Sequence, residues 1–314
     1  MSPADAVHLL LAELRARRSE GVHSVELGPE AEVALRDLIR RAKGLPAAPT
    51  PSAGPAPRDS APAAPVLVAS PAAPPRAPKV DDSSVPPPPK VTFPDVGSKA
   101  ERLAALRTLV EMCPECRRHC PPGAAPLLGI GSAEAEIVFV GEAPSEEDVK
   151  AGEPFVGPAG QILTKAITAM GLARESVYLT HVMAWRPETP TGFGNRAPTS
   201  REMAFCRPYL AAQLAILRPK VVVALGNSAV NGLFSLEGEA AFKVTQRRGT
   251  WLDLDGLPVL PTYHPSYLLR NPSPAVKRQF WEDLLSVMER LGLPISDRQR
   301  GFYLPKPTQR GDSE

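Results

Sequence analysis

The chain has 314 residues and a formal net charge of +2, from 36 Lys and Arg against 34 Asp and Glu. This near-neutral balance excludes a protein that attracts nucleic acid through its overall field, so any contact with DNA must be local. No run approaches 18 consecutive apolar residues, and the acidic N-terminus lacks an apolar signal core. We therefore expect a cytoplasmic protein that makes no contact with membranes.

The first 97 residues are expected to lie outside the main domain. Residues 1–43 contain two stretches with helical apolar spacing, which predict a short helical N-terminal segment. Residues 44–97 are rich in Ala and Pro and poor in large apolar side chains, so they predict a disordered, partly polyproline II linker. We expect this N-terminal region to bind another protein, which its sequence does not identify.

Residues 98–293 predict one α/β domain. The sequence Ser98-Lys-Ala-Glu101 has the form of a capping box and predicts a helix that leads into the first cysteines. Apolar runs predict strands at 137–140, 177–183, 221–225 and 259–263, and helical spacing predicts helices at 160–170, 200–217, 228–233 and 275–291. This alternation predicts a three-layer α/β/α fold around a central, mostly parallel four-stranded sheet. Residues 250–254 are a candidate for a further strand, and residues 294–314 are expected to form a flexible tail.

Two polar loops follow predicted strands. The first runs from Gly141 through Asp148 to Gly160 and clusters carboxylates, glycines and Phe155 directly after a strand. The second spans residues 262–270 and follows the last apolar run of the predicted sheet. Ligands of open α/β sheets bind beyond the carboxyl ends of the strands, so we expect the two loops to form two walls of one pocket. An aromatic ring among glycines and carboxylates suits an uncharged planar ligand better than a phosphate.

These loops resemble the two signature motifs of the uracil-DNA glycosylase superfamily, and most of all its family 4 iron–sulfur enzymes of bacteria and archaea. The resemblance covers residues 98–293 and includes, in the family's order, Arg186-Pro187, 195–198, 206–210 and 225–229. It implies a hydrolase: a monofunctional DNA glycosylase of base-excision repair that removes a deaminated base, with uracil as the first candidate. DNA that contains such bases is the expected partner, and we expect a monomer.

The resemblance also implies roles for individual residues. His264 would donate a hydrogen bond to O2 of the leaving base, which is a form of oxyanion stabilisation. Glu142, and after it Asp148, would stabilise the sugar cation and orient water. Taken without the motifs, a histidine before a proline and a run of acids at a helix start are more often structural. The resemblance assigns base-binding positions to Ala143, Phe155 and His181.

A third group of residues would contact DNA. A leucine inserted into a duplex can fill the gap left by an extruded base. Core packing is the competing interpretation for these leucines, and a solvated surface is the competing one for the neighbouring arginines. The residues implied are Ser266, Leu268, Leu269 and Arg270.

Two substitutions depart from the family pattern in the pocket. Ser145 stands where the family has glycine, in a loop that approaches the ligand, and His181 stands where the family reads uracil with asparagine. An amide can pair with both N3–H and O4 of uracil, whereas a neutral imidazole has its donor and acceptor on different sides of the ring. Hypoxanthine and xanthine therefore stay open as substrates. A non-hydrolytic damage-binding or polymerase-associated member of the superfamily is the alternative function.

The cysteines depart from the family pattern as well. The family holds a [4Fe–4S] cluster with four cysteines, of which Cys113, Cys116 and Cys206 have counterparts here. The remaining ligand position is Trp185, and Cys120 is the only other cysteine in the chain. Three outcomes stay open from the sequence: a [4Fe–4S] cluster that uses Cys120, a zinc site, or no metal.

Overall fold

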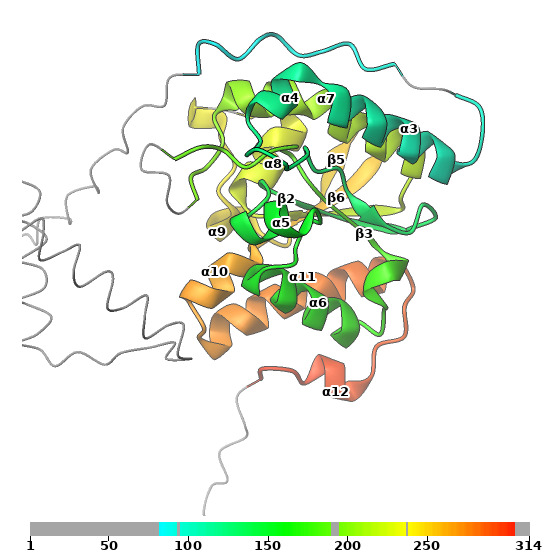
Figure 1. The fold of residues 1–314 in the computed structure, drawn as a ribbon. Coiled ribbons are helices and arrows are strands. Elements are labelled where there is room, and N and C mark those ends of the chain that lie inside the picture. The colour runs from blue at the N-terminus through cyan, green and yellow to red at the C-terminus, as the bar shows by residue number, and fades with distance from the viewer. Residues whose placement is uncertain (1–81, 93–94, 190–194, 237, 305–314) are drawn as a thin grey trace, which may run out of the picture. The chain divides into compact units, whose positions relative to one another are not determined.

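The computed structural model describes residues 82–92, 95–189, 195–236 and 238–304 (Figure 1). The chain divides into two compact units, Met1–Pro75 and Arg76–Glu314, and all described residues belong to the second. The helical segment predicted for residues 1–43 and most of the predicted linker lie outside the described residues. The described end of that linker packs on the domain, because Val85 is 2% exposed and its carbonyl accepts a hydrogen bond from Arg201.

The core of the domain is a six-stranded sheet with the order β1-β3-β2-β4-β6-β5. Its four inner strands pair in parallel, and they are β3 (Tyr178–His181), β2 (Ile137–Gly141), β4 (Val221–Leu225) and β6 (Leu257–Thr262). The four predicted strands are these four. Two antiparallel edge strands complete the sheet: β5 (Leu252–Leu254), which lies in the candidate strand 250–254, and β1 (Ile130–Gly131), which was not predicted. The strand β1 has no recognisable apolar pattern because it contains only two residues, one of which is glycine.

Helices cover both faces of the sheet, as the prediction of three layers requires (Figure 1). One layer contains α3 (Lys99–Met112), α4 (Pro114–Arg118), α7 (Ser200–Leu217) and α8 (Asn227–Phe234). The opposite layer contains α6 (Pro158–Ala169), α10 (Pro265–Arg270) and α11 (Pro274–Arg290). Short elements complete the domain: α5 (Glu146–Ala151), η1 (Arg174–Ser176), η2 (Gly238–Ala240), α9 (Val244–Arg247) and α12 (Asp297–Arg300).

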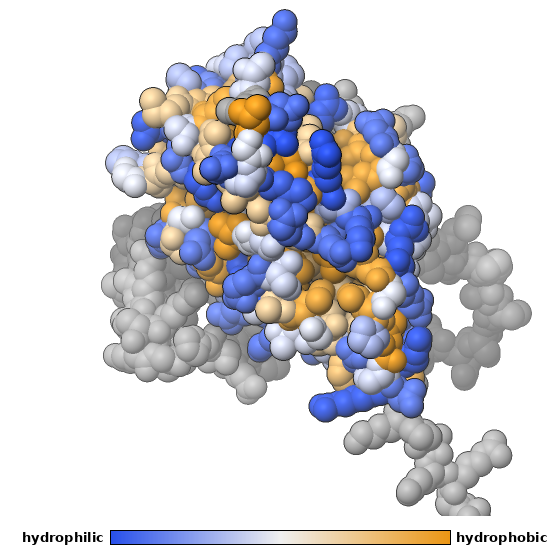
Figure 2. Space-filling model, turned by 90° about the vertical axis from the view of Figure 1, so that its right-hand side faces the viewer, coloured by the Kyte–Doolittle hydropathy of each residue, from blue (hydrophilic) through white to orange (hydrophobic). Residues whose placement is uncertain are grey.

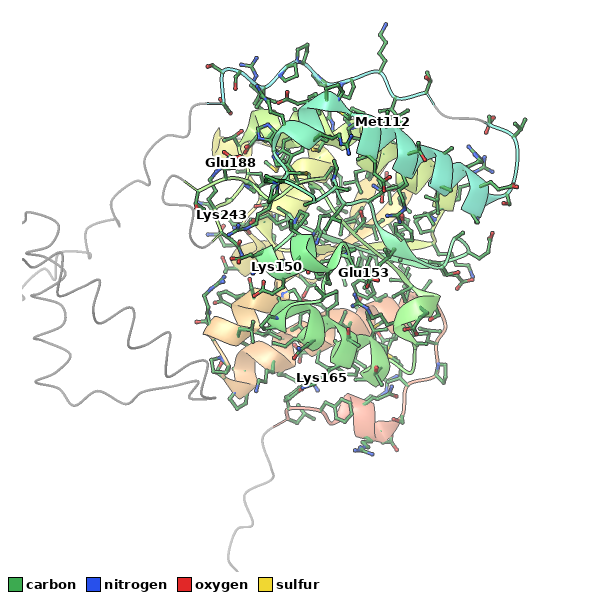
Figure 3. All side chains as sticks on the ribbon, viewed as in Figure 1. Met112, Lys150, Glu153, Lys165, Glu188 and Lys243 are labelled. Carbon is green, nitrogen blue, oxygen red and sulfur yellow. The ribbon has the colours of Figure 1, made fainter. Side chains whose placement is uncertain are left out.

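Local sequence signals explain where the main elements begin and why they pack. The predicted capping box is present, because Glu101 N donates to Ser98 Oγ at 3.2 Å and Ser98 N donates to Glu101 Oε2 at 2.7 Å. Strands β2 and β4 are buried at every position, as expected for strands covered by helices on both faces. Charged side chains such as Lys150, Glu153 and Lys165 project outward in Figure 3. Most side chains between the layers are apolar, so the sheet and its helices share one core.

One face of the domain is mixed in polarity (Figure 2), and part of the C-terminal segment packs on the domain. On the face drawn in Figure 2, hydrophobic areas are interrupted by hydrophilic side chains. Among the described helices, none combines the length and the apolar character needed to cross a bilayer. The predicted C-terminal tail contains α12, which docks on the domain: Gln299 accepts a hydrogen bond from Trp281 at 2.6 Å and donates one to the carbonyl of Ala169 at 2.8 Å.

Candidate active site

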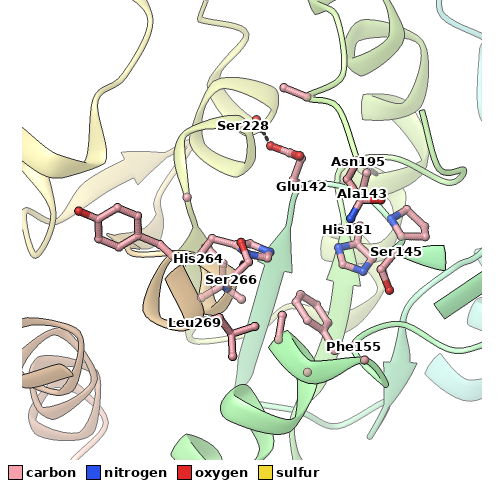
Figure 4. A pocket seen from close by; sticks show the side chains of 18 of the residues that line it. Glu142, Ala143, Ser145, Phe155, His181, Asn195, Ser228, His264, Ser266 and Leu269 are labelled. Carbon is pink, nitrogen blue, oxygen red and sulfur yellow. Dashed lines mark hydrogen bonds between the residues drawn. The ribbon is translucent and has the colours of Figure 1, made fainter. Parts of the chain in front are cut away.

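A cavity of about 640 Å³ opens at the carboxyl edge of the sheet. The inner strands are parallel, so the loops that follow β2, β3, β4 and β6 meet there. The predicted residues that line this cavity are Glu142, Ala143, Asp148, Phe155, His181, His264, Ser266, Leu269 and Arg270 (Figure 4). Leu268 does not line it; this side chain is 5% exposed and packs in the core, which agrees with the packing interpretation. The sequence motifs therefore converge on one site.

Glu142 follows β2 and reaches across the cavity to α8. The hydroxyl of Ser228, in the first turn of α8, donates a hydrogen bond to Glu142 Oε2. Burial raises the pKa of Glu142, although this hydrogen bond and the charges of His181 and Arg270 act in the opposite direction. The carboxylate is thus held in one place and is more basic than a free glutamate.

His264 follows β6 and is the N-cap of α10. Its Nδ1 accepts a hydrogen bond from the backbone N–H of Ser266 at 3.1 Å, and the Ser266 hydroxyl lies 2.8 Å from the same atom. A backbone N–H can only donate, so Nδ1 is the acceptor and a neutral ring carries its proton on Nε2. Burial, with the charges of His181 and Arg270, lowers the pKa of His264 to about 3. At neutral pH this residue is an uncharged N–H donor.

Asp148 holds the loop that carries Phe155. Its Oδ2 accepts a hydrogen bond from the backbone N–H of Ser145 at 2.9 Å and its Oδ1 accepts one from Val156 at 2.8 Å. Burial favours a higher pKa, but the contact with His181 and these N–H groups hold the pKa of Asp148 below its usual range. Both carboxylate oxygens of Asp148 thus accept hydrogen bonds from the backbone, which indicates that this residue positions the loop. Glu142 is then the acid of the two whose carboxylate is better placed to contact a ligand.

The departure at Ser145 has a local structural reason. Ser145 is the N-cap of α5, and its hydroxyl accepts a hydrogen bond from Asp148 N at 3.2 Å, which completes a second capping box. Phe155 follows with φ at +59°, a conformation rare for residues other than glycine. A Cβ on Gly160 would lie 1.8 Å from the Phe155 carbonyl oxygen, so only glycine fits there. These contacts fix the Phe155 ring at the edge of the cavity.

Aromatic rings line the lower part of the cavity. The Phe155 ring stacks on His181 with a centroid distance of 4.3 Å, and it lies 6.3 Å from the His264 ring. Figure 4 shows the two imidazoles on either side of Phe155, with the Glu142 carboxylate facing the same space. An aromatic surface, a neutral N–H donor and a basic carboxylate thus converge on one cavity.

The rim of the cavity contains residues for which no individual role was expected, although the segment 195–198 is among those that carry the resemblance. Asn195 and Arg196 line it, and Arg196 pairs with Glu202 at 2.6 Å. For Ser228, three residues after the end of β4, no individual role was expected either, although the segment 225–229 is among those that carry the resemblance. Leu269 and Arg270 are exposed at the opposite rim. The segments 195–198 and 225–229 were both recognised from the resemblance, but which of their side chains reach the cavity depends on the folded chain.

The thiols do not match the ligand set of a [4Fe–4S] cluster. The Cys116 thiol contacts Cys206 and Cys113, and these contacts together with burial raise the pKa of Cys116. The Cys120 thiol donates instead to the carbonyl of Cys116, at 3.3 Å. The indole of Trp185 has no atom that can bind iron. Among the residues that the structure describes, no group of three or more His, Cys, Asp or Glu side chains is arranged to hold a metal ion.

Packing explains what the tryptophan does instead. Trp185 is 1% exposed and stacks on His119 with a centroid distance of 4.7 Å and an interplanar angle of 12°. Phe205 also packs against the indole of Trp185, with a centroid distance of 5.8 Å and an interplanar angle of 58°. The indole is therefore a core side chain that ties the segment after β3 to α7 and to the end of α4.

Comparisons with known proteins identify the family of this chain. The model of the Uracil DNA glycosylase superfamily matches residues 128–285. The type-4 uracil-DNA glycosylase of Thermotoga maritima is 40% identical over 188 residues, which cover 60% of this chain and 93% of the relative. The type-4 enzymes of Sulfurisphaera tokodaii and Pyrobaculum aerophilum are 37% and 36% identical, and the alignments cover 60% and 58% of this chain and 84% and 91% of those relatives. The chain belongs to the uracil-DNA glycosylase superfamily.

Proposed function

We propose that this protein is a monofunctional DNA glycosylase that hydrolyses the bond between deoxyribose and a deaminated base, with uracil as the first substrate. The observation that carries the proposal is the pairing, across one cavity, of a neutral His264 N–H donor with a Ser228-bound Glu142 carboxylate. Membership of the superfamily and the names of its type-4 relatives support it. The chemistry is that of a hydrolase in uracil repair.

His264 stabilises the leaving base. Cleavage of the N-glycosidic bond leaves negative charge on the base, and Nε2–H of His264 donates to O2, where that charge accumulates. A neutral donor suits this step, because it holds its proton while it stabilises the anion. The low pKa of His264, which burial produces, keeps the ring in that state at neutral pH.

Glu142 acts on the sugar side of the same bond. Its carboxylate stabilises positive charge on the deoxyribose and orients the water that attacks C1′. The hydrogen bond from Ser228 fixes one oxygen of Glu142 and leaves the other for water. Phe155 supplies the stacking surface, since the base must leave the duplex before the bond is accessible.

Leu269 is the residue proposed to fill the gap in the duplex. It is 46% exposed at the cavity rim, whereas its neighbour Leu268 is buried. We expect Leu269→Ala to slow base release from duplex DNA about tenfold and to leave single-stranded substrates nearly unaffected, because only a duplex has a gap to fill. Parallel single-turnover assays on both substrates measure this.

Leu268→Ala is the matched control for that experiment. Loss of a buried leucine is expected to lower the free energy of unfolding by about 2–5 kcal/mol without selecting between substrates. If Leu269→Ala slowed base release equally on duplex and single-stranded DNA, the result would argue against the insertion of Leu269 into the duplex.

A panel of oligonucleotides tests the proposed function directly. The full chain is incubated with DNA that contains uracil, hypoxanthine or xanthine, and free base and abasic sites are quantified. The proposal predicts free base with an equivalent number of abasic sites, and uracil as the best substrate. Tight binding of lesion DNA that stays intact would identify a non-hydrolytic damage-binding protein instead.

We further propose that this chain folds without a [4Fe–4S] cluster. The family's four ligand positions hold three cysteines and Trp185, and the Cys120 thiol donates to the carbonyl of Cys116, so the purified wild-type protein is expected to contain far less than one iron per chain. The Trp185→Cys variant restores the fourth ligand position and is expected to gain iron and acid-labile sulfide in reconstitution, toward about four of each. A wild-type protein with that full complement would show that Cys120 or another residue moves to complete the site.

A further inference from the structure

His181 stands at the end of β3 in an unusual position. It is 6% exposed, and its ring lies over Phe155 with an interplanar angle of 29°. Gly141 is its partner in the neighbouring strand, and a Cβ there would lie 2.5 Å from His181 Nδ1 and 2.6 Å from Phe155 Cζ. Phe155 is itself only 4% exposed. The imidazole therefore covers the ring on which a base would stack, and both rings rest on a bare glycine.

Neither ring nitrogen of His181 has a hydrogen-bond partner. Unpaired buried polar atoms are rare in folded proteins, and each carries a cost that a ligand removes when it supplies the missing partner. The nearest charged group is Asp148, whose Oδ2 lies 3.7 Å from Nε2, beyond hydrogen-bond distance. Glu142 and His264 are the other titratable groups that interact with this ring. His181 is thus a polar side chain in the pocket whose ring nitrogens could form hydrogen bonds with a ligand.

Asp148 selects which nitrogen is available. Its carboxylate is fixed by two backbone N–H groups, so its negative charge stays beside Nε2. That charge favours the tautomer with the proton on Nε2, which leaves Nδ1 as an acceptor. A base that meets this edge must therefore present a hydrogen-bond donor.

We propose that His181 determines base specificity: it covers Phe155 in the empty site, and it accepts a hydrogen bond at Nδ1 from a ring N–H of the base that displaces it. This inference rests on the proposed glycosylase function. It selects bases with a lactam N–H, which uracil carries at N3 and hypoxanthine and xanthine carry at N1. Cytosine and adenine present a bare ring nitrogen at that place, so two acceptors would face each other. Thymine and guanine share the N–H, so the cavity walls must exclude their 5-methyl and 2-amino groups.

A single acceptor forms one hydrogen bond with the edge of the base, whereas an amide can form two. An amide at this position would also donate to O4 of uracil, whereas His181 in the proposed tautomer has its only N–H at Nε2, on the side of Asp148. A base with a weaker hydrogen-bond acceptor in place of O4 should therefore be released by the wild-type protein at nearly the same rate as uracil. 4-Thiouracil is the probe, because it keeps N3–H and replaces O4 with sulfur, a weak acceptor.

The experiment compares single-turnover release of uracil, 4-thiouracil and hypoxanthine by the full chain and by His181→Asn and His181→Ala. The wild type is expected to release uracil and 4-thiouracil at rates within about threefold, and His181→Asn is expected to favour uracil about tenfold, the worth of one hydrogen bond. The alanine variant has no polar group at 181 and reports the effect of the larger sulfur alone.

Two results with 4-thiouracil, and a third with cytosine, would overturn the inference. One is a wild-type preference for uracil over 4-thiouracil as large as that of His181→Asn. The other is a ratio that is the same in all three proteins. Failure of the proposed function looks different, because then none of the proteins releases any base. Release of cytosine by the wild type as fast as release of uracil would also contradict the assigned acceptor.

Discussion

His264→Ala is expected to slow base release about 10²–10³-fold, the usual cost of removing a donor that stabilises a developing oxyanion. The physical reason is the fixed tautomer: Ser266 N–H occupies Nδ1, so the only proton of the neutral ring is on Nε2. Alanine removes that donor and leaves O2 of the leaving base without its partner. Rates come from single-turnover release of uracil at saturating protein.

Ser266→Ala is the matched control for His264. It removes the hydroxyl at 2.8 Å from Nδ1 but keeps the backbone N–H at 3.1 Å, so the tautomer persists and the loss should stay below about tenfold. A His264→Ala protein that works within about threefold of the wild type would refute the assigned role.

Glu142→Gln is expected to slow base release by about 10²–10⁴-fold, because glutamine cannot act as a base or balance positive charge on the sugar. The pH dependence follows from the direction of the pKa shift. Burial raises the pKa of Glu142 above its ordinary value of 4.5, and the reaction needs the carboxylate. Activity should therefore fall as pH decreases through a point above 4.5, and the measurement is the rate of base release as a function of pH.

Ser228→Ala sharpens the same prediction. Its hydroxyl lowers the pKa of Glu142, so without it the pKa rises further and the acidic limb of the pH profile moves to higher pH. The rate on the alkaline plateau should change less than in Glu142→Gln, since the carboxylate is still present. An acidic limb that stays in place in Ser228→Ala would show that another group controls it.

Much of the fold was predictable because its signals are local. The four inner strands are short apolar runs, and the helix that begins after Ser98 is marked by its capping box. The edge strand β1 has two residues, and α10 has six with Pro265 at its start, so neither shows periodicity. Both exist because neighbours in the fold supply their hydrogen bonds and their packing.

The site was predictable only in part, for the same reason. The resemblance to the family identified Glu142, His264 and Phe155, and position directly after a strand placed Glu142 first among the acids. The two tasks of Asp148, which holds the Phe155 loop and faces His181, depend on contacts made by folding. The stacking of His181 on Phe155 is likewise invisible in the sequence, although the substitution itself is plain. The sequence located the groups proposed to react, and the structure shows the contacts that hold them in place.

The most direct test of the central claim is a crystal structure of the Glu142→Gln variant with DNA that contains uracil. We expect an extruded base stacked on Phe155, with His264 Nε2 about 2.7–3.1 Å from O2 and His181 displaced from the Phe155 ring. A base that stays in the duplex, or one bound elsewhere while His181 still covers Phe155, would contradict this claim.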